Sequence, residues 1–527
     1  MSDVFTELLR LVIAAACVAG AADLALSLVG VRANLTGRLL GLLGRFAGQA
    51  GAGLARGAWS AGKWLLFGMA PDDGYMTPRE IKREYSPANT GLVLSDKYRL
   101  SEPASMMHVL VLGGSGSGKT SGFLAPNLAQ LPGACPVIVN DPKGSLLERY
   151  APVLAVSHRI SCLNMVDPEN SCHFNPVSAC RSPEQLDSLV ATLLAADQEL
   201  FWKHNAASMV RGLATALLDH PDEKYHNLTN LSFLIDSLQR GRSDKPVGES
   251  LMVFMRTHLK SKHPRQFQKF MAQFGSSEKM VQGWASTANA ALDPLISPDL
   301  QKVSCTNDLP LDRLRDEPHA IFLTIPPAKS RRCFAFMSLF YAHLFDRLLS
   351  RLPEPGDHPV YLLLDEFPAM HLPDFAEIIA QAREFRLSLT LICQSLSQLS
   401  KRYGSDDAKV IMENCGTRIL LPGLEHSVAK QFAEALGRIE TKDPKTGVTE
   451  RRDVASPQEI SRLRDQALVF STNKKPALIP FVKIHDNRRL RGLRGAPGFQ
   501  MDWPPGRETP LIDLSGYRLN RGNSAGA

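Results

Sequence analysis

The chain has 527 residues, of which 44% are hydrophobic and 21% are charged, and its formal net charge is +7 at pH 7. This length exceeds one hydrophobic core and predicts about two to four domains, while the composition excludes a chain that is disordered over most of its length. The nine cysteines form no CxxC pair and no ligand-like spacing with histidine, which argues against a zinc site and favours reduced thiols in the cytosol. The mildly basic charge suits contact with nucleic acid or an anionic membrane surface.

The first 70 residues are expected to anchor the chain in a membrane. Residues 8–31 are mostly apolar over about the 20 residues that a helix needs to cross a bilayer. Acidic residues precede this run and basic residues follow it, so the positive-inside rule places the chain after residue 31 in the cytoplasm. Residues 39–69 are compatible with a second, poorer transmembrane helix or with an amphipathic helix on the inner leaflet.

The stretch VLVLGGSGSGKTSG, residues 109–122, predicts a phosphate-binding loop. Residues 113–120 match GxxxxGK[ST] without gaps, after an apolar strand-like run and before a segment that can be helical. In such a loop the backbone N–H groups surround the β-phosphate, the lysine reaches the β- and γ-phosphates, and the threonine hydroxyl ligates Mg²⁺. We therefore expect ATP and Mg²⁺ as cofactors, with the nucleotide held by Gly113, Gly114, Ser115, Gly116, Ser117, Gly118, Lys119, Thr120 and Ser121.

A second acidic site is expected after the apolar run PVYLLL. Residues 360–364 predict a buried parallel strand, and Asp365 and Glu366 follow at its carboxyl end, where such sheets bind ligands. We expect Asp365 to hold Mg²⁺ through water and Glu366 to polarise the attacking water. A third strand beginning at Leu387 ends in Gln394, whose amide either senses the γ-phosphate or simply faces solvent. The predicted catalytic residues are Lys119, Asp365, Glu366 and Gln394, and the predicted metal ligands are Thr120 and Asp365.

Strand-like runs alternate with helical ones over residues 107–166 and again over residues 320–484, which is typical of a parallel sheet covered by helices. Between them, residues 182–300 show helical spacing and almost no alternating runs, which predicts an all-α insert. We expect five parts in chain order: a membrane anchor (1–70), the first part of a nucleotide-binding domain (71–180), an all-α insert (181–300), the second part of the nucleotide-binding domain (301–487) and a flexible tail (488–527).

Seven stretches of the chain, taken in order, resemble the coupling proteins of type IV secretion systems, the TraG/TraD kind that drive conjugative DNA transfer. The resemblance covers about residues 87–487. The stretches are GGSGSGKTSGFLAPNL, VIVNDPKGSLLERY, FNPV, FWKHNAASMVRGL, LLLDEFPAM, CQSLSQLSKRYG and ENCGTRILLPG.

This resemblance implies an α/β fold with a RecA-like P-loop motor domain, an inserted all-α domain and an N-terminal anchor in the bacterial inner membrane, with the ATPase domain in the cytoplasm. It also implies a homo-hexameric ring. ATP hydrolysis by that ring helps to deliver relaxase-bound single-stranded DNA, effector proteins or both to the components of a secretion channel. The sequence does not distinguish DNA cargo from protein cargo.

The resemblance also assigns residues by motif. Asp141 and Lys143 fall in the family's DxKG element. The family's arginine-glycine pair reads Phe385-Arg386 in this chain, so three arginines stay candidates for the group that reaches a neighbouring subunit's nucleotide: Arg383, Arg386 and Arg418.

Two other functions stay open. The first is a docking platform that binds ATP with little turnover, although the acidic pair at residues 365 and 366 favours turnover. The second is a chromosome-segregation translocase of the FtsK type, against which the helical insert and the order of the motifs argue.

Overall fold

The computed structural model describes residues 74–131, 135–165, 167–195, 200–241, 243–325, 330–442, 449–493 and 496–517. The predicted membrane anchor lies outside these ranges, and no helix within them is long and apolar enough to cross a bilayer. The chain divides into two units by its internal contacts, and the larger one contains residues 74–438 and 451–527. Two strands, β10 (Arg438–Lys442) and β11 (Thr449–Asp453), pair with each other, and the smaller unit includes residues 439–442 and 449–450 of them.

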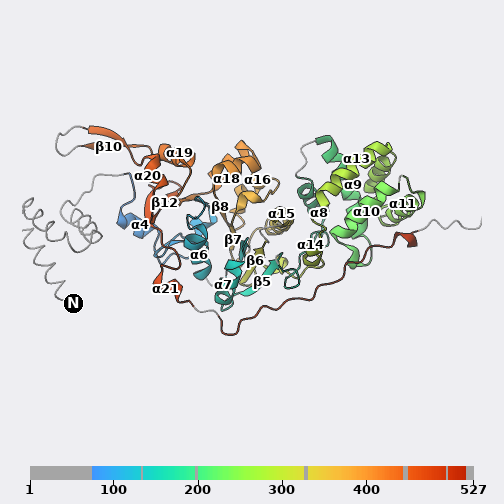
Figure 1. The fold of residues 1–527 in the computed structure, drawn as a ribbon, viewed down its shortest axis with the longest axis horizontal. Helices are drawn as coiled ribbons and strands as arrows, with labels where there is room; N and C mark the ends of the chain where they lie inside the picture. The colour runs from blue at the N-terminus through green and yellow to red at the C-terminus, as the bar shows by residue number, and fades with distance from the viewer. Residues whose placement is uncertain are drawn as a thin grey trace, which may run out of the picture. The chain divides into compact units, whose positions relative to one another are not determined.

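A sheet of nine strands, counted over the described residues, forms the centre of the larger unit (Figure 1). The strands lie in the order β13-β12-β9-β3-β8-β7-β4-β6-β5. Strand β12 is antiparallel to both of its neighbours, and the other neighbouring pairs are parallel. The strands are β3 (Val109–Leu112), β4 (Val137–Asp141), β5 (Arg159–Asn164), β6 (His319–Thr324), β7 (Val360–Leu364), β8 (Leu387–Cys393), β9 (Thr417–Leu420), β12 (Gln466–Ser471) and β13 (Ala477–Pro480).

The central strands are continuous apolar runs because helices cover both faces of the sheet. In β3, Val109 and Val111 pack into one core with the side chains of α6 (Ala125–Ala129) and α7 (Ser145–Leu154). Leu110 and Leu112 point the other way, because side chains alternate along a strand. They share a second core with four further helices: α15 (Ser330–Leu348), α16 (Phe375–Ala382), α18 (Ser405–Asn414) and α19 (His426–Leu436).

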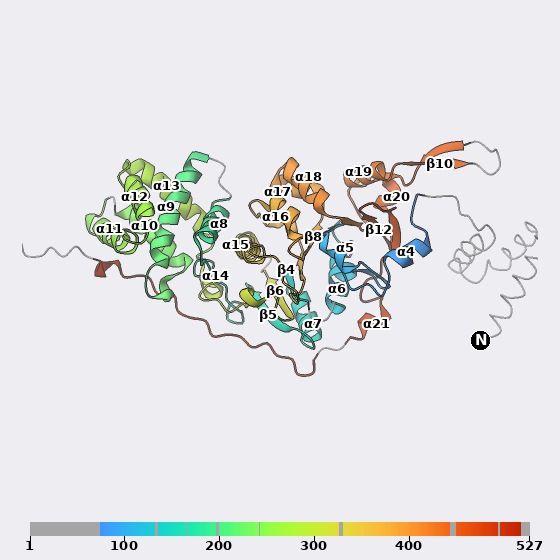
Figure 2. The same cartoon turned by 180° about the vertical axis from the view of Figure 1, so that it is seen from behind.

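The described residues between β5 and β6 contain helices and no strand. Figure 2 shows α9 to α13 gathered as one group. Helix α9 contacts α8, α10, α11, α12 and α13, and small or flexible residues such as Ala206, Met209 and Ala214 are buried along it, which lets these neighbours approach closely. The helices are α8 (Pro183–Leu193), α9 (Leu200–Leu218), α10 (Leu228–Arg240), α11 (Lys245–Leu259), α12 (Pro264–Phe274), α13 (Glu278–Leu292) and α14 (Pro298–Val303).

The mixed α/β fold with a large, mostly parallel sheet is therefore confirmed. Smaller elements flank this sheet, and several of them begin with a capping side chain, as at Thr77 and Ser456. They are α4 (Pro78–Glu84), β1 (Val93–Ser95), β2 (Tyr98–Arg99), α5 (Glu102–Met106), α17 (Leu396–Tyr403), α20 (Pro457–Ser461) and α21 (Arg488–Arg491).

The segment that we expected to be a flexible tail is mostly exposed, but it contacts the rest of the larger unit at several points. We call residues 496–517 the C-terminal strap. The main-chain N–H of Ile512 donates to Asn230 Oδ1 at 2.8 Å, and Asn230 Nδ2 donates to the carbonyl oxygen of Pro510 at 3.0 Å. Ile512 and Leu514 are buried, and Met501 and Trp503 are partly buried. These contacts hold the strap at several points, whereas the composition, rich in Gly and Pro, predicts a flexible tail.

Candidate active site

Three motifs that are far apart in the sequence meet at one edge of the sheet. Strand β8 is parallel to both β3 and β7, with Leu112 opposite Cys393 and Leu364 opposite Leu391. The residues that follow these strands therefore emerge at the same edge, where ligands of open α/β sheets bind. The glycine-rich loop follows β3, the acidic pair follows β7, and Gln394 follows β8.

The loop after β3 has a backbone that requires glycine. Gly116 and Gly118 adopt φ values of 74° and 93°, in the left-handed region that strains residues with a side chain. At Gly114 a Cβ would lie 2.2 Å from the carbonyl oxygen of Gly423. A helical segment, η2 (Lys119–Leu124), begins directly after the loop and continues as α6, so the loop and the helix N-terminus together form a cradle suited to an anion.

Lys119 is held by its own loop. Its Nζ donates to the carbonyl oxygens of Gly113 at 2.7 Å and Gly114 at 2.8 Å. Burial lowers the pKa of Lys119, although the carboxylates of Asp365 and Glu366 oppose this by favouring the charged form.

Other features of the loop fit a phosphate ligand. The hydroxyl of Ser117 is buried and has no hydrogen-bond partner in the described part of the chain. Thr120, the predicted metal ligand of the loop, is exposed and follows Lys119 in η2. A buried polar atom without a partner often marks a place for a ligand or a water, and here it lies in a glycine cradle. These residues therefore fit a nucleotide phosphate with Mg²⁺.

In the nucleotide-free protein, the environment of Asp365 disfavours its charged form. Burial raises the pKa of Asp365 to about 6, and the neighbouring charge of Glu366 adds to this effect, whereas Lys119 and the N–H of Glu366 oppose it. That N–H donates to Asp365 Oδ1 at 3.0 Å. Glu366 has a φ of 53°, a left-handed conformation that is strained for a residue with a side chain and is concentrated at functional sites. A cation near this pair would favour both charged carboxylates.

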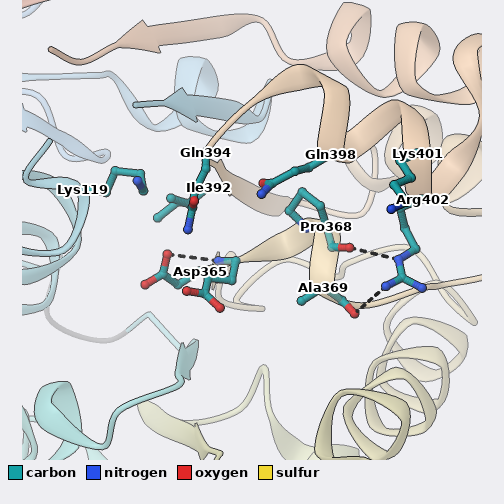
Figure 3. A pocket seen from close by; sticks show the side chains of 10 residues that line it. Lys119, Asp365, Pro368, Ala369, Ile392, Gln394, Gln398, Lys401 and Arg402 are labelled. Atoms are coloured by element: carbon teal, nitrogen blue, oxygen red, sulfur yellow. Dashed lines mark hydrogen bonds between the residues drawn. The ribbon is translucent and has the colours of Figure 1, made fainter. Parts of the chain in front are cut away.

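The four predicted catalytic residues line one cavity of about 380 Å³: Lys119, Asp365, Glu366 and Gln394. Figure 3 shows Lys119 and Gln394 on one side of this space and Asp365 across from them. The rest of the lining is Pro368, Ala369, Ile392, Gln398, Lys401 and Arg402. The geometry therefore brings one lysine, two carboxylates and one amide to a common space.

Sequence reasoning missed three polar residues that α17 contributes to this cavity: Gln398, Lys401 and Arg402. Arg402 is held in place, since its Nε donates to the carbonyl oxygen of Pro368 at 3.0 Å (Figure 3). The spacing was available in the sequence. Lys401 and Arg402 follow Gln398 by three and four residues, which places the three side chains on one face of a helix.

The DxKG element lies beside the cavity rather than in its lining. Asp141 ends β4, and its Oδ2 accepts the N–H groups of Leu146 and Leu147, both at 2.8 Å, so it orders the start of α7. Lys143 is exposed. The preceding residue makes a connection that the sequence did not suggest, because Asn140 Nδ2 donates to the carbonyl oxygen of Asp365 at 3.4 Å.

The three candidate arginines differ in their partners. Arg386 donates to the carbonyl oxygen of Asp357 at 2.7 Å and pairs with Glu102 at 2.8 Å. Arg418 donates to the carbonyl oxygen of Met412 at 3.2 Å. Arg383 is exposed, and the described residues give it no hydrogen-bonded or ion-paired side-chain partner.

A family model described as Type IV secretory system Conjugative DNA transfer matches residues 75–480. The chain belongs to this family. It is also similar to the coupling protein TraD of Escherichia coli (strain K12), with 32% identity over 95 residues, which are 18% of this chain and 13% of that protein. The chain thus covers only a small part of this relative's length.

Two solved structures share the fold. The plasmid coupling protein TrwB in complex with the non-hydrolysable GTP analogue GDPNP has a TM-score of 0.61 and 19% identity, covering 79% of this chain and 96% of that one. TrwB in complex with ADP and Mg²⁺ has a TM-score of 0.60 and 18% identity, covering 78% of this chain and 93% of that one. At these identities the likeness establishes the fold alone.

Proposed function

We propose that this protein is a membrane-anchored ATP hydrolase of conjugative transfer, which recruits relaxase-bound single-stranded DNA, effector proteins or both and delivers them to a type IV secretion channel. The observation that carries the proposal is the common cavity of Lys119, Asp365, Glu366 and Gln394. Membership of the conjugative DNA transfer family supports the transport role. The anchor in the inner membrane and the cytoplasmic position of the motor are part of the proposal.

Each site residue has a role in this proposal. Lys119 exchanges its two loop carbonyl partners for the β- and γ-phosphates of ATP. Glu366 orients the attacking water and accepts its proton, and Gln394 senses the γ-phosphate. Thr120 and Asp365, the latter through water, hold Mg²⁺, which neutralises charge on the phosphate oxygens when it is bound. The TrwB complexes with ADP and Mg²⁺ and with an ATP analogue support this choice of ligands.

We also propose that the chain acts as a homo-hexameric ring in which Arg383 reaches the nucleotide of a neighbouring subunit. Arg386 and Arg418 already have partners within their own subunit, as described above. An exposed guanidinium without such partners is free to bind a transferred phosphoryl group across an interface.

The variant Glu366→Gln tests the motor against the ATP-binding platform. We expect it to bind ATP as the wild type does, because only a proton acceptor is lost, and to hydrolyse ATP at least roughly 100-fold more slowly. ATP binding, hydrolysis and cargo transfer are measured on the full chain in membranes. Glu434→Gln, which changes an exposed carboxylate of α19, is the matched control. Transfer that continues without hydrolysis would favour the platform.

A further inference from the structure

Strand β13 brings a further lysine to the edge of the sheet at which the glycine-rich loop lies. Strand β13 is antiparallel to β12, β12 is antiparallel to β9, and β9 is parallel to β3. Strands β13 and β3 therefore run in the same direction, and residues 481–484 emerge at the same edge as the loop. They lie on its other side from the acidic pair, because β9 and β8 flank β3 on opposite sides.

The residues after β13 pack directly on the start of the helix that follows the loop. The N–H of Ile484 donates to the carbonyl oxygen of Ser121 at 2.8 Å. The ring of Phe481 is buried and occupies the space beside Gly122, where a Cβ would lie 2.1 Å from its Cζ atom. Glycine at position 122, just outside the GxxxxGK[ST] motif, is thus required for this close approach.

This packing places Lys483 beside the loop. A Cβ at Gly118, the residue directly before Lys119, would lie 3.2 Å from Cε of Lys483. The ammonium group is one bond further along the side chain. Lys483 is partly buried, and it forms no ion pair with a carboxylate of the described residues. A partly buried cation without a counter-ion attracts an anion, and phosphates are the anions that a glycine-rich loop binds.

We propose that Lys483 is a binding residue of the nucleotide site, which contacts the diphosphate part of the nucleotide from the side of the loop opposite Asp365 and Glu366. This inference rests on the proposed function in one respect, namely that the loop binds a nucleoside di- or triphosphate. In this proposal the two lysines bind different sets of phosphates. Lys119 binds the β- and γ-phosphates, whereas Lys483 binds only the phosphates that ATP and ADP share. Lys483 therefore contributes equally to the ground state and the transition state.

The variant Lys483→Met tests the binding role of Lys483 in the full chain. We expect the Kd values for ADP and for a non-hydrolysable ATP analogue to rise together by about tenfold, since one charge-assisted contact is lost from both complexes. The value of kcat at saturating ATP should stay within about twofold, because uniform binding does not change the chemical step. Lys483→Arg should retain most of the affinity. Lys430→Met, on the exposed face of α19, is the matched control and should change neither constant.

Competition by inorganic pyrophosphate separates phosphate contact from contact with the nucleoside. Lys483→Met should weaken pyrophosphate competition as much as it weakens ADP binding. Unchanged ADP affinity, a loss of kcat with intact affinity, or a loss for ADP but not for pyrophosphate would each overturn the proposal. Because ADP and pyrophosphate binding need no turnover, these measurements decide the role of Lys483 even if the wild type does not hydrolyse ATP.

Discussion

Asp365 destabilises the free protein at neutral pH. Its pKa rises from an ordinary value of 3.8 to about 6, first because of burial and then because of the charge of Glu366. The unfolded chain therefore releases this proton at a lower pH than the folded chain does. Stability that the protonated group provides is fully present below about pH 4 and is lost as the pH rises to about 6. Mg²⁺ with a nucleotide would compensate this loss in the proposed complex.

The variant Asp365→Asn should therefore stabilise the nucleotide-free protein while it abolishes catalysis. At pH 7.5 we expect a higher melting temperature, corresponding to roughly 1–3 kcal/mol, and at pH 4 we expect no difference from the wild type. Added Mg²⁺ and ATP should raise the melting temperature of the wild type and have little effect on the variant. Thermal denaturation across pH, with and without ligand, measures both effects. A variant that is less stable than the wild type at pH 7.5 without ligand would contradict this account.

At the residue scale, the sequence predicted four polar residues of the cavity but neither their hydrogen-bond partners nor the three polar residues of α17. The loop, the acidic pair and Gln394 each follow an apolar run, and the carboxyl ends of parallel strands necessarily share an edge. The pairing of Lys119 with the carbonyl oxygens of Gly113 and Gly114 depends on backbone geometry that no motif records. Asn140 was overlooked for a similar reason, because its contact is with a main-chain oxygen.

At the scale of elements, two of the candidate arginines lie on the connection that follows α16, and they differ in their contacts. Helix α16 ends at Ala382, and Arg383 and Arg386 follow before β8 begins at Leu387. Arg386 has a φ of 51° and bonds to Asp357 and Glu102, so it fixes this connection to the rest of the domain. Arg383 lies on the same connection but is exposed. The short segment thus combines one arginine that is bonded within its own subunit and one that is exposed.

This difference predicts opposite phenotypes for the two arginines. Arg383→Ala should lower kcat of the assembled protein by roughly 10³-fold and leave its melting temperature unchanged, as for an arginine that acts across an interface. Arg386→Ala should lower the melting temperature, because it leaves a carboxylate and a carbonyl oxygen without a partner. ATPase assays and thermal denaturation distinguish the two.

Mixing subunits gives a stricter test. Subunits with Arg383→Ala have an intact loop, and subunits with Lys119→Ala have an intact Arg383. Neither should hydrolyse ATP alone, whereas the mixture should recover part of the activity if Arg383 acts on a neighbour's nucleotide. A mixture without activity would assign Arg383 to its own subunit.

Strand positions could be predicted well and the contribution of β13 could not. Residues 360–364 and the start at Leu387 agree with β7 and β8, since strands buried on both faces read as unbroken apolar runs. No sequence pattern of this kind predicts the position of Lys483. Its place beside Gly118 depends on the antiparallel pairing of β12 with both β9 and β13, which is decided by tertiary packing rather than by local pattern.

At the scale of the whole molecule, the C-terminal strap connects the sheet to the helices of the insert. Near its start, the N–H of Ala496 donates to the carbonyl oxygen of Pro152 in α7 at 2.8 Å. Further on, the N–H of Arg507 donates to Cys305 Sγ at 3.3 Å. At its far end, the hydroxyl of Tyr517 lies 3.2 Å from Nε2 of His258 in α11. A segment without strands or long helices thus joins elements that are hundreds of residues apart in the chain.

The strap should detach when its buried anchor is made polar. Ile512 is 3% exposed and the adjacent Leu511 is 53% exposed, so the two positions offer a matched pair. Ile512→Asp should cost roughly 3 kcal/mol or more of local stability, because an apolar contact is lost and a carboxylate is buried without a partner. Leu511→Asp should cost little. Hydrogen exchange and limited proteolysis over residues 496–517 report detachment directly. If the strap is equally protected in both variants, Ile512 does not anchor it. If the strap is already as unprotected in the wild type as in Ile512→Asp, these residues form the flexible tail that the composition predicts.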